Sequence, residues 1–78
     1  MNKVFYEVVV DQMYKDDVTA RVCVSHPTLE GAVKVYSNYI RSSYRLDVRF
    51  SSIALFEKRF DEIGKLVGNP KKIVSYEK

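Results

Sequence analysis

Residues 18–40, "VTARVCVSHPTLEGAVKVYSNYI", contain a change of hydrophobic period that decides the fold. Along residues 18–25, aliphatic side chains alternate with polar or small ones, which is typical of a half-buried β-strand. One side of the strand would carry Val18, Ala20, Val22 and Val24, and the other Thr19, Arg21, Cys23 and Ser25. Pro27 cannot donate to a β-ladder and Thr28 is a favourable N-cap, so the pattern predicts that a helix begins at Leu29.

The predicted helix is amphipathic. Its apolar stripe, with about 100° between successive residues, consists of Leu29, Ala32, Val33, Tyr36 and Ile40, flanked by Val35 and Tyr39. Lys34, Asn38 and Arg41 lie on the opposite side. The spacing predicts a helix of about 13 residues that ends near Ser42–Ser43 and packs on the aliphatic side of a sheet.

Further strands are predicted on both sides of this unit. Residues 3–10 are rich in β-branched and aromatic residues, with Val4, Tyr6, Val8 and Val10 on one side. Polar residues 11–17 read as a turn, so residues 3–10 and 18–25 would form an antiparallel hairpin. Residues 43–49 are a connection, and residues 50–60 a third strand with Phe50, Ala54 and Phe56 on one side and Ile53 and Leu55 on the other.

The C-terminal part is expected to be short turns and an edge. Residues 61–64 read as a turn and residues 68–70, "GNP", as a second break. Residues 71–77 either add a short last strand or pack Ile73 against an edge. Residues 1–78 thus predict a single α+β domain: an antiparallel β-sheet, ββαβ with one or two further short strands, with one amphipathic helix packed on one face.

The second face of this sheet is also expected to be apolar. Phe5, Val9 and Cys23 would lie on it, and Ile53 and Leu55 are further candidates for it. A small domain rarely leaves so much apolar surface in water, so a homodimer or another protein is expected to cover it.

Composition excludes several classes of protein. No apolar run approaches the roughly 18–20 residues that span a bilayer, and the first residues do not resemble a signal peptide. The single cysteine, Cys23, cannot form an internal disulfide, so a reducing cytoplasm is the expected location.

An enzyme is not expected, and neither a metal nor a cofactor site is. The single histidine, His26, stands at a strand-to-helix junction, where a role in a cap or turn explains it. The pairs Asp16–Asp17 and Asp61–Glu62 both fall in predicted turns, where acidic residues bind backbone amides. The three glycines are too far apart to form a phosphate-binding loop.

Basic residues gather in the C-terminal half. Residues 1–40 have a net charge of −1, whereas residues 41–78 have nine basic and five acidic residues, a net charge of +4. In residues 38–50, "NYIRSSYRLDVRF", arginines alternate with aromatic residues, the combination that binds phosphates and stacks on unpaired bases. No named nucleic-acid-binding motif matches.

The predicted helix end divides this stretch, since it places Arg45 and Arg49 in the connection to the third strand. The candidate nucleic-acid-binding residues are Tyr44, Arg45 and Arg49, followed by Arg41, Lys58 and Arg59.

Residues 55–66, "LFEKRFDEIGKL", together with the order of elements, resemble the small non-structural protein of the gokushoviruses, phages with single-stranded DNA genomes. In that family a strand contains a Leu-Tyr pair and a later Phe-Asp pair, and an acidic turn then ends in glycine. Leu55–Phe56, Phe60–Asp61 and Gly64 match these places, whereas Lys58–Arg59 replace a family glycine. The resemblance implies a viral accessory protein of the host cytoplasm to which DNA binding is attributed, and it supplies no site residues.

Two functions therefore compete. In the first, a non-enzymatic phage accessory protein contacts single-stranded DNA through its basic C-terminal half. In the second, a protein-interaction module, either a host-directed inhibitor or an assembly factor, uses the apolar sheet face or an edge strand.

Overall fold

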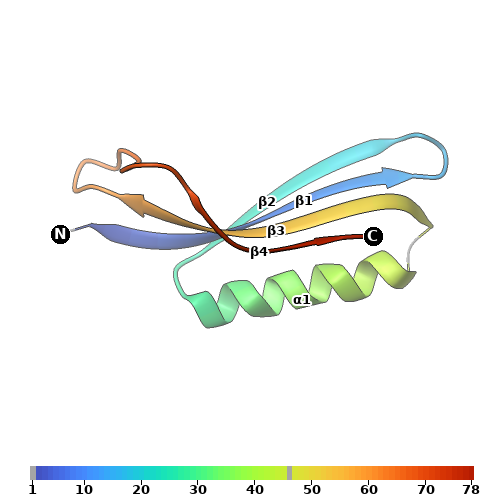
Figure 1. The fold of residues 1–78 in the computed structure, drawn as a ribbon, viewed down its shortest axis with the longest axis horizontal. Coiled ribbons are helices and arrows are strands. Elements are labelled where there is room, and N and C mark those ends of the chain that lie inside the picture. Colours follow the sequence, from blue (N-terminus) through green and yellow to red (C-terminus); the bar gives the residue numbers. More distant parts are fainter. Residues whose placement is uncertain (1, 46) are drawn as a thin grey trace.

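The computed structural model describes residues 2–45 and 47–78, with Arg45 described by its backbone alone. Its elements are β1 (Lys3–Tyr14), β2 (Thr19–His26), α1 (Leu29–Arg45), β3 (Val48–Phe60) and β4 (Lys71–Glu77). Within the described residues, the strands form one four-stranded antiparallel sheet in the order β2-β1-β3-β4, and α1 runs along one face (Figure 1). The predicted α+β class is confirmed, with the order ββαββ.

The molecule is long and flat. Its extents are 45 × 22 × 15 Å and its radius of gyration is 13.9 Å, whereas a compact chain of this length has a radius of gyration of about 11.5 Å. The β1–β2 turn and the end of α1 lie at one end of the sheet, and the β3–β4 turn lies at the other (Figure 1). Over the face away from α1, the described residues form no second layer.

The core lies between α1 and the middle of β1 and β3. Val8 stands opposite Leu55 and Val10 opposite Ile53, and all four are at most 1% exposed. Side chains that are directly opposite in an antiparallel pair share a face, so Ile53 and Leu55 lie under α1. The prediction that made Ile53 and Leu55 candidates for the sheet face away from the helix is wrong, because the register with β1 places both on the helix side.

The N-terminus of α1 follows the sequence prediction. Thr28 Oγ1 accepts a hydrogen bond from the Gly31 N–H at 3.2 Å, and the Thr28 carbonyl accepts from the Ala32 N–H at 3.1 Å. The buried side of the helix is shifted from the predicted stripe, since Leu29 and Val33 are each 43% exposed. Val35 and Tyr39, predicted as flanks, pack against the core instead.

The C-terminal end of α1 differs from the prediction. The helix continues to Arg45 rather than ending near Ser42–Ser43, so residues 43–45 are not part of a connection. Ser43 is fully buried, and its hydroxyl donates to the Ile40 carbonyl at 2.7 Å. Lys78 Nζ donates to the Ser43 carbonyl at 2.6 Å and so satisfies a carbonyl of the last turn.

The strands are also longer than predicted. Residues 11–14 belong to β1 and pair with β3, and residues 11–13 pair with β2 as well. The turn is confined to residues 15–18. The Tyr14 N–H donates to the Val18 carbonyl at 2.9 Å, and Asp17 takes a positive φ of 66°. β3 begins at Val48, two residues before the predicted start.

The turn predicted at residues 61–64 is confirmed. Asp61 Oδ1 accepts hydrogen bonds from the Ile63 and Lys65 amides at 3.1 and 2.9 Å. Gly64 has φ 85°, a left-handed conformation that favours glycine. Residues 71–77 form the edge strand β4, and Ile73 is the extra residue where the register with β3 shifts. No helix among the described residues is long and apolar enough to cross a membrane.

Candidate nucleic-acid interface

Phenylalanine and tyrosine are segregated between the two faces of the sheet. We call the face away from α1 the open face. Register places all four phenylalanines of the chain on it: Phe5, Phe50, Phe56 and Phe60. Tyr6, Tyr36, Tyr39 and Tyr76 instead pack against the core on the helix side. The open face therefore carries aromatic rings without hydroxyl groups.

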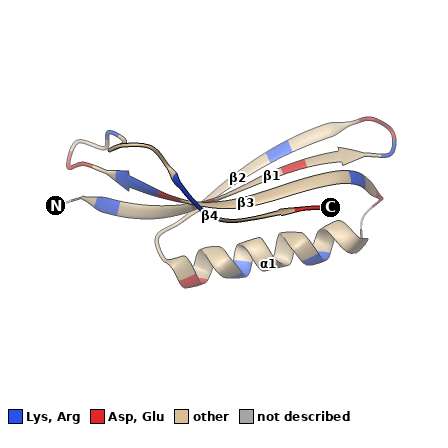
Figure 2. Ribbon diagram, viewed as in Figure 1, with Lys and Arg blue, Asp and Glu red and all other residues tan. Residues whose placement is uncertain are grey.

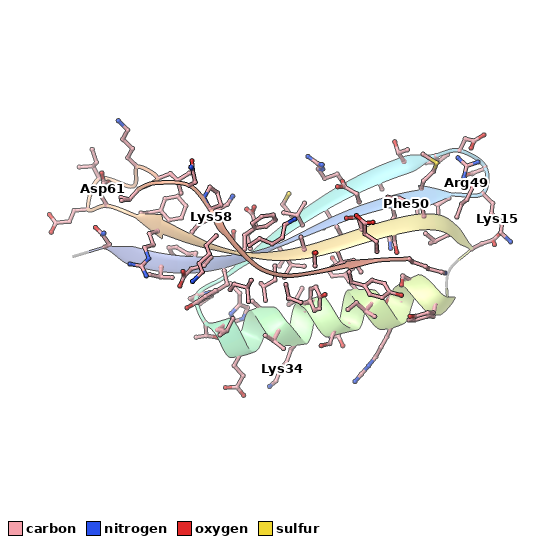
Figure 3. All side chains as sticks on the ribbon, viewed as in Figure 1. Lys15, Lys34, Arg49, Phe50, Lys58 and Asp61 are labelled. Carbon is pink, nitrogen blue, oxygen red and sulfur yellow. The ribbon has the colours of Figure 1, made fainter. Side chains whose placement is uncertain are left out.

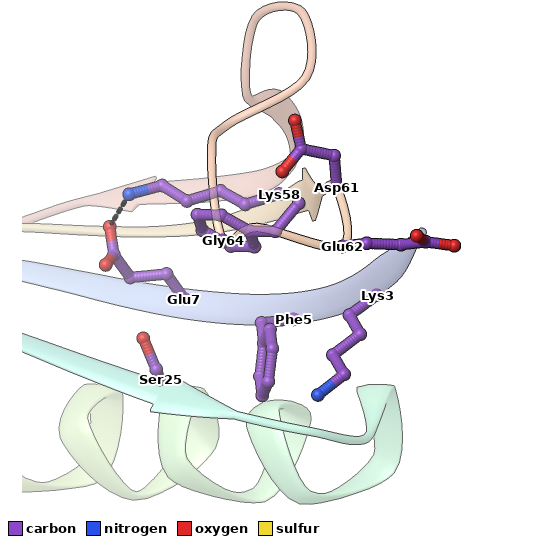
Figure 4. Close-up of a pocket in the computed structure, with 9 residues that line it drawn as sticks. Lys3, Phe5, Glu7, Ser25, Lys58, Asp61, Glu62 and Gly64 are labelled. Carbon is purple, nitrogen blue, oxygen red and sulfur yellow. Dashed lines mark hydrogen bonds and ion pairs between the residues drawn. The ribbon is translucent and has the colours of Figure 1, made fainter. Parts of the chain in front are cut away.

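A cavity of about 460 Å³ opens on this face near the β3–β4 turn (Figure 4). Phe5 of β1 and Phe60 of β3 are part of its wall, with ring centroids 5.9 Å apart and planes at 69°. Glu7 and Lys58 also line it and form an ion pair with 2.7 Å between Oε1 and Nζ. These two side chains are only 18% and 25% exposed. The cavity thus combines apolar rings with one shielded ion pair.

Basic side chains without an ion-pair partner among the described residues gather at the same end of the sheet as this cavity. We call this set the basic end: Lys3, Arg59, Lys65, Lys71 and Lys72. None of them forms an ion pair with a described residue. Register places Lys3 and Lys72 on the open face and Arg59 and Lys71 on the helix side, and only Lys3 of them lines the cavity. Figure 2 shows basic segments of β1, β3, β4 and the β3–β4 turn close together at this end of the sheet.

Acidic residues at the same end reduce its charge without removing the excess. Glu7 is paired with Lys58, and the Asp61 side chain accepts the two turn amides. Counting Glu57 and Glu62 as well, four acidic residues stand beside six basic ones, which are the basic end and Lys58. The lysines and Arg59 can therefore attract an anionic ligand, although the field is modest.

At the opposite end of the sheet, two basic side chains are neutralised by ion pairs. Arg49 pairs with Asp17 at 2.8 Å and Lys15 with Asp47 at 2.8 Å. Figure 3 shows Lys15 and Arg49 at this end and Lys58 and Asp61 at the other.

In the middle of the sheet, Arg21 donates to Asp11 through Nε at 2.6 Å and Nη2 at 3.0 Å. These hydrogen bonds lower the pKa of the Asp11 carboxyl below its usual value.

The six residues predicted from the sequence do not form one site. Arg41, Tyr44 and Arg45 are on the last turns of α1, and Arg49 is on β3 near its start. The side chain of Arg45 lies outside the described residues. Lys58 and Arg59 lie at the other end of the sheet, where only Lys58 lines the cavity (Figure 4).

Two details of the prediction require correction. The helix includes Arg45, so Arg41 and Arg45 are one helical turn apart, and Arg49 is the one of these three arginines that belongs to a strand. Tyr44, predicted to be free for a ligand, is 64% exposed but engaged. The Tyr76 hydroxyl donates to the Tyr44 hydroxyl, which raises the pKa of Tyr76. Lys78 Nζ lies 5.6 Å from the centroid of the Tyr44 ring.

Several residues of the cavity were missed by sequence reasoning. Lys3, Phe5 and Glu7 are in a stretch recognised as a strand, and their two-residue spacing places them on one side. Their partners Lys58 and Phe60 lie more than 50 residues later, as the Lys3–Phe60 and Phe5–Lys58 pairs show. No local signal predicts that pairing.

The structure also places the other two groups considered from the sequence, His26 and Cys23. His26 Nδ1 accepts a hydrogen bond from the Thr28 N–H at 3.3 Å, at the start of α1. Cys23 is exposed on β2. Among the described residues, no three His, Cys, Asp or Glu side chains lie together as a metal site would require.

No protein-family model matches the chain, and no curated protein or solved structure is significantly similar to it. What the site can do follows from its residues. Unpaired lysines can hold phosphates, and phenylalanine rings can contact bases.

Proposed function

We propose that this chain is a small, non-enzymatic protein that binds single-stranded nucleic acid across the open face at its basic end. One observation carries the proposal: the cavity walled by Phe5 and Phe60 is lined by Lys3 and lies at the end of the sheet that carries four further basic side chains, and none of these five forms an ion pair with a described residue. Phosphate neutralisation and ring contacts together are what sequence-tolerant binding to a single strand requires. The resemblance to the gokushovirus non-structural protein supports single-stranded DNA as the ligand and a phage accessory role in the host cytoplasm.

The salt dependence of binding tests this proposal. A double variant, Lys65→Ala with Lys72→Ala, removes two phosphate contacts at the basic end. The slope of log K against log salt should become less negative by about 1.4, because each phosphate contact on a single strand adds about −0.7. Fluorescence anisotropy of a labelled oligonucleotide across a salt series measures the slope.

The matched control is Lys34→Ala with Arg41→Ala, which makes the same change of charge on α1. This control should bind with the wild-type slope. A flatter slope in the control alone would place the interface along the helix, where the sequence analysis placed Arg41. Absence of any binding at low salt would overturn the proposal.

The middle of the open face favours a second candidate function, protein–protein interaction. Val9 and Ala54 lie opposite each other there, and the neighbouring charges Arg21–Asp11 and Lys58–Glu7 are already paired. A patch that is apolar and internally neutralised suits a protein surface better than a phosphate backbone. Either a second copy of this chain or a host protein would cover it.

For this second candidate, we expect the wild-type protein either to form a dimer whose population rises with concentration or to recover a host protein. The variant Val9→Lys should lose that association. The substitution places a charge at the centre of the patch. Light scattering across a concentration series and a pull-down from host lysate measure the two forms of association. A strictly monomeric wild type that recovers no host protein would exclude this candidate.

A further inference from the structure

The floor of the cavity differs chemically from its surroundings. Lys58 Nζ is bonded to Glu7 Oε1, so the two charges neutralise each other and the floor does not attract phosphate. No described residue donates a hydrogen bond to the second oxygen of Glu7, Oε2. Ser25 of β2 stands opposite Glu7 in the register and lines the same cavity. The floor thus offers a carboxylate acceptor, an ammonium donor and a hydroxyl side by side.

The other carboxylates beside the cavity are not comparable. Asp61 Oδ1 already accepts the amides of Ile63 and Lys65, which holds it in the turn. Glu62 has an interaction partner as well. Glu7 is therefore the carboxylate placed to accept hydrogen bonds from a ligand in this cavity.

An adjacent donor and acceptor between aromatic side chains match the polar edge of a nucleobase. Unpaired bases are recognised by contact with aromatic rings and by hydrogen bonds on their Watson–Crick edges. Guanine presents two donors, N1–H and N2–H₂, beside the acceptor O6. A carboxylate can accept both donors, and an ammonium group can donate to O6. Thymine has a single N–H donor and no exocyclic amine, so it satisfies the carboxylate less well.

We infer that the cavity binds one unpaired base of the nucleic acid and prefers guanine, with Glu7 accepting from N1 and N2 and Lys58 donating to O6. The inference rests on the proposed function, because the strand delivers the base. It separates two tasks: the basic end holds phosphates without regard to sequence, and the Glu7–Lys58 pair reads one base.

The test compares an oligothymidylate with the same strand carrying one central guanine. Wild-type protein should bind the guanine strand about tenfold more tightly, the size of one good bidentate contact. Glu7→Gln leaves one acceptor and no charge, so its preference should fall below about twofold. The control Asp11→Asn removes the carboxylate of a neighbouring ion pair on the same strand and face, outside the cavity, and should keep the preference. A preference that survives in Glu7→Gln, or is absent from the wild type, overturns the inference.

A second measurement on the wild-type protein keeps the two proposals separable and does not depend on the variant folding. Guanosine monophosphate should shift the NMR signals of the Phe5, Ser25 and Lys58 amides, and thymidine monophosphate should not. If those shifts occur while no oligonucleotide binds, the base site stands and the proposed function fails. If oligonucleotides bind while both monophosphates leave these amides unchanged, the proposed function stands and the base site is overturned.

Discussion

Replacing Leu55 with alanine is expected to lower the free energy of unfolding by about 3 kcal/mol, which leaves much of the protein unfolded at 25 °C. Leu55 is fully buried beneath α1 and stands between Val8 of β1 and Val74 of β4. Its loss leaves a cavity in a core that has few other buried residues with which to fill it. A domain of this size has a stability of only a few kcal/mol, so one such cavity consumes most of it.

Urea unfolding followed by circular dichroism measures this loss. The control is Leu29→Ala, the same chemical change at a position that is 43% exposed in the first turn of α1. This control should cost less than about 1 kcal/mol, because little apolar surface is removed from the core. Equal losses in the two variants would contradict the assignment of the core.

The second large effect is expected at Gly31, where a substitution that normally stabilises a helix should destabilise this one. Alanine in place of glycine inside a helix usually adds about 1 kcal/mol of stability. Here an added Cβ would overlap the ring of His26, which lies over Gly31. The ring would have to move away, which breaks the hydrogen bond that the Thr28 N–H donates to His26 Nδ1. We expect the lost hydrogen bond and the displaced ring to cost about 2 kcal/mol together. This cost exceeds the gain of about 1 kcal/mol in helix propensity, so Gly31→Ala should lower the free energy of unfolding by about 1 kcal/mol.

A double-mutant cycle separates this clash from ordinary helix propensity. In a His26→Ala background the obstacle is gone, so Gly31→Ala should raise stability by about 1 kcal/mol. The sum of the two single effects therefore differs from the effect of the double variant by about 2 kcal/mol, well above the error of such a cycle. Thermal or urea unfolding of the four proteins gives the coupling energy. A stabilising Gly31→Ala in both backgrounds would show that the ring yields without cost.

The elements that the sequence predicted well are those whose signals are local. The alternation in residues 18–25, the break at Pro27 and the Thr28 cap all depend on neighbouring residues, and the structure contains the strand, the break and the cap. The turn at Asp61–Gly64 is of the same kind, because a side chain and a positive φ within four residues form it.

The boundaries that were missed depend on residues distant in the chain. The last turn of α1 is supported by Lys78, which donates to the Ser43 carbonyl although it stands 35 residues later in the chain. β1 continues through Tyr14 because β3 pairs with it along nearly its whole length. Neither contact leaves a trace in the local hydrophobic pattern, so both elements were predicted too short.

The candidate site shows the same division more sharply. Composition revealed a basic C-terminal half, and the two-residue period of residues 3–10 placed Phe5 and Glu7 on one side of a strand. Whether a basic residue stays unpaired depends on residues that are distant in the chain. Arg49 pairs with Asp17 and Lys58 pairs with Glu7, whereas Lys3 and Lys72 pair with no described carboxylate. The sequence by itself determined the fold class and the helix start, since hydrogen bonding and hydrophobic period act between near neighbours. Only the tertiary structure decided where the free charge and the aromatic cavity meet, because pairing between β1 and β3 joins residues more than 50 positions apart.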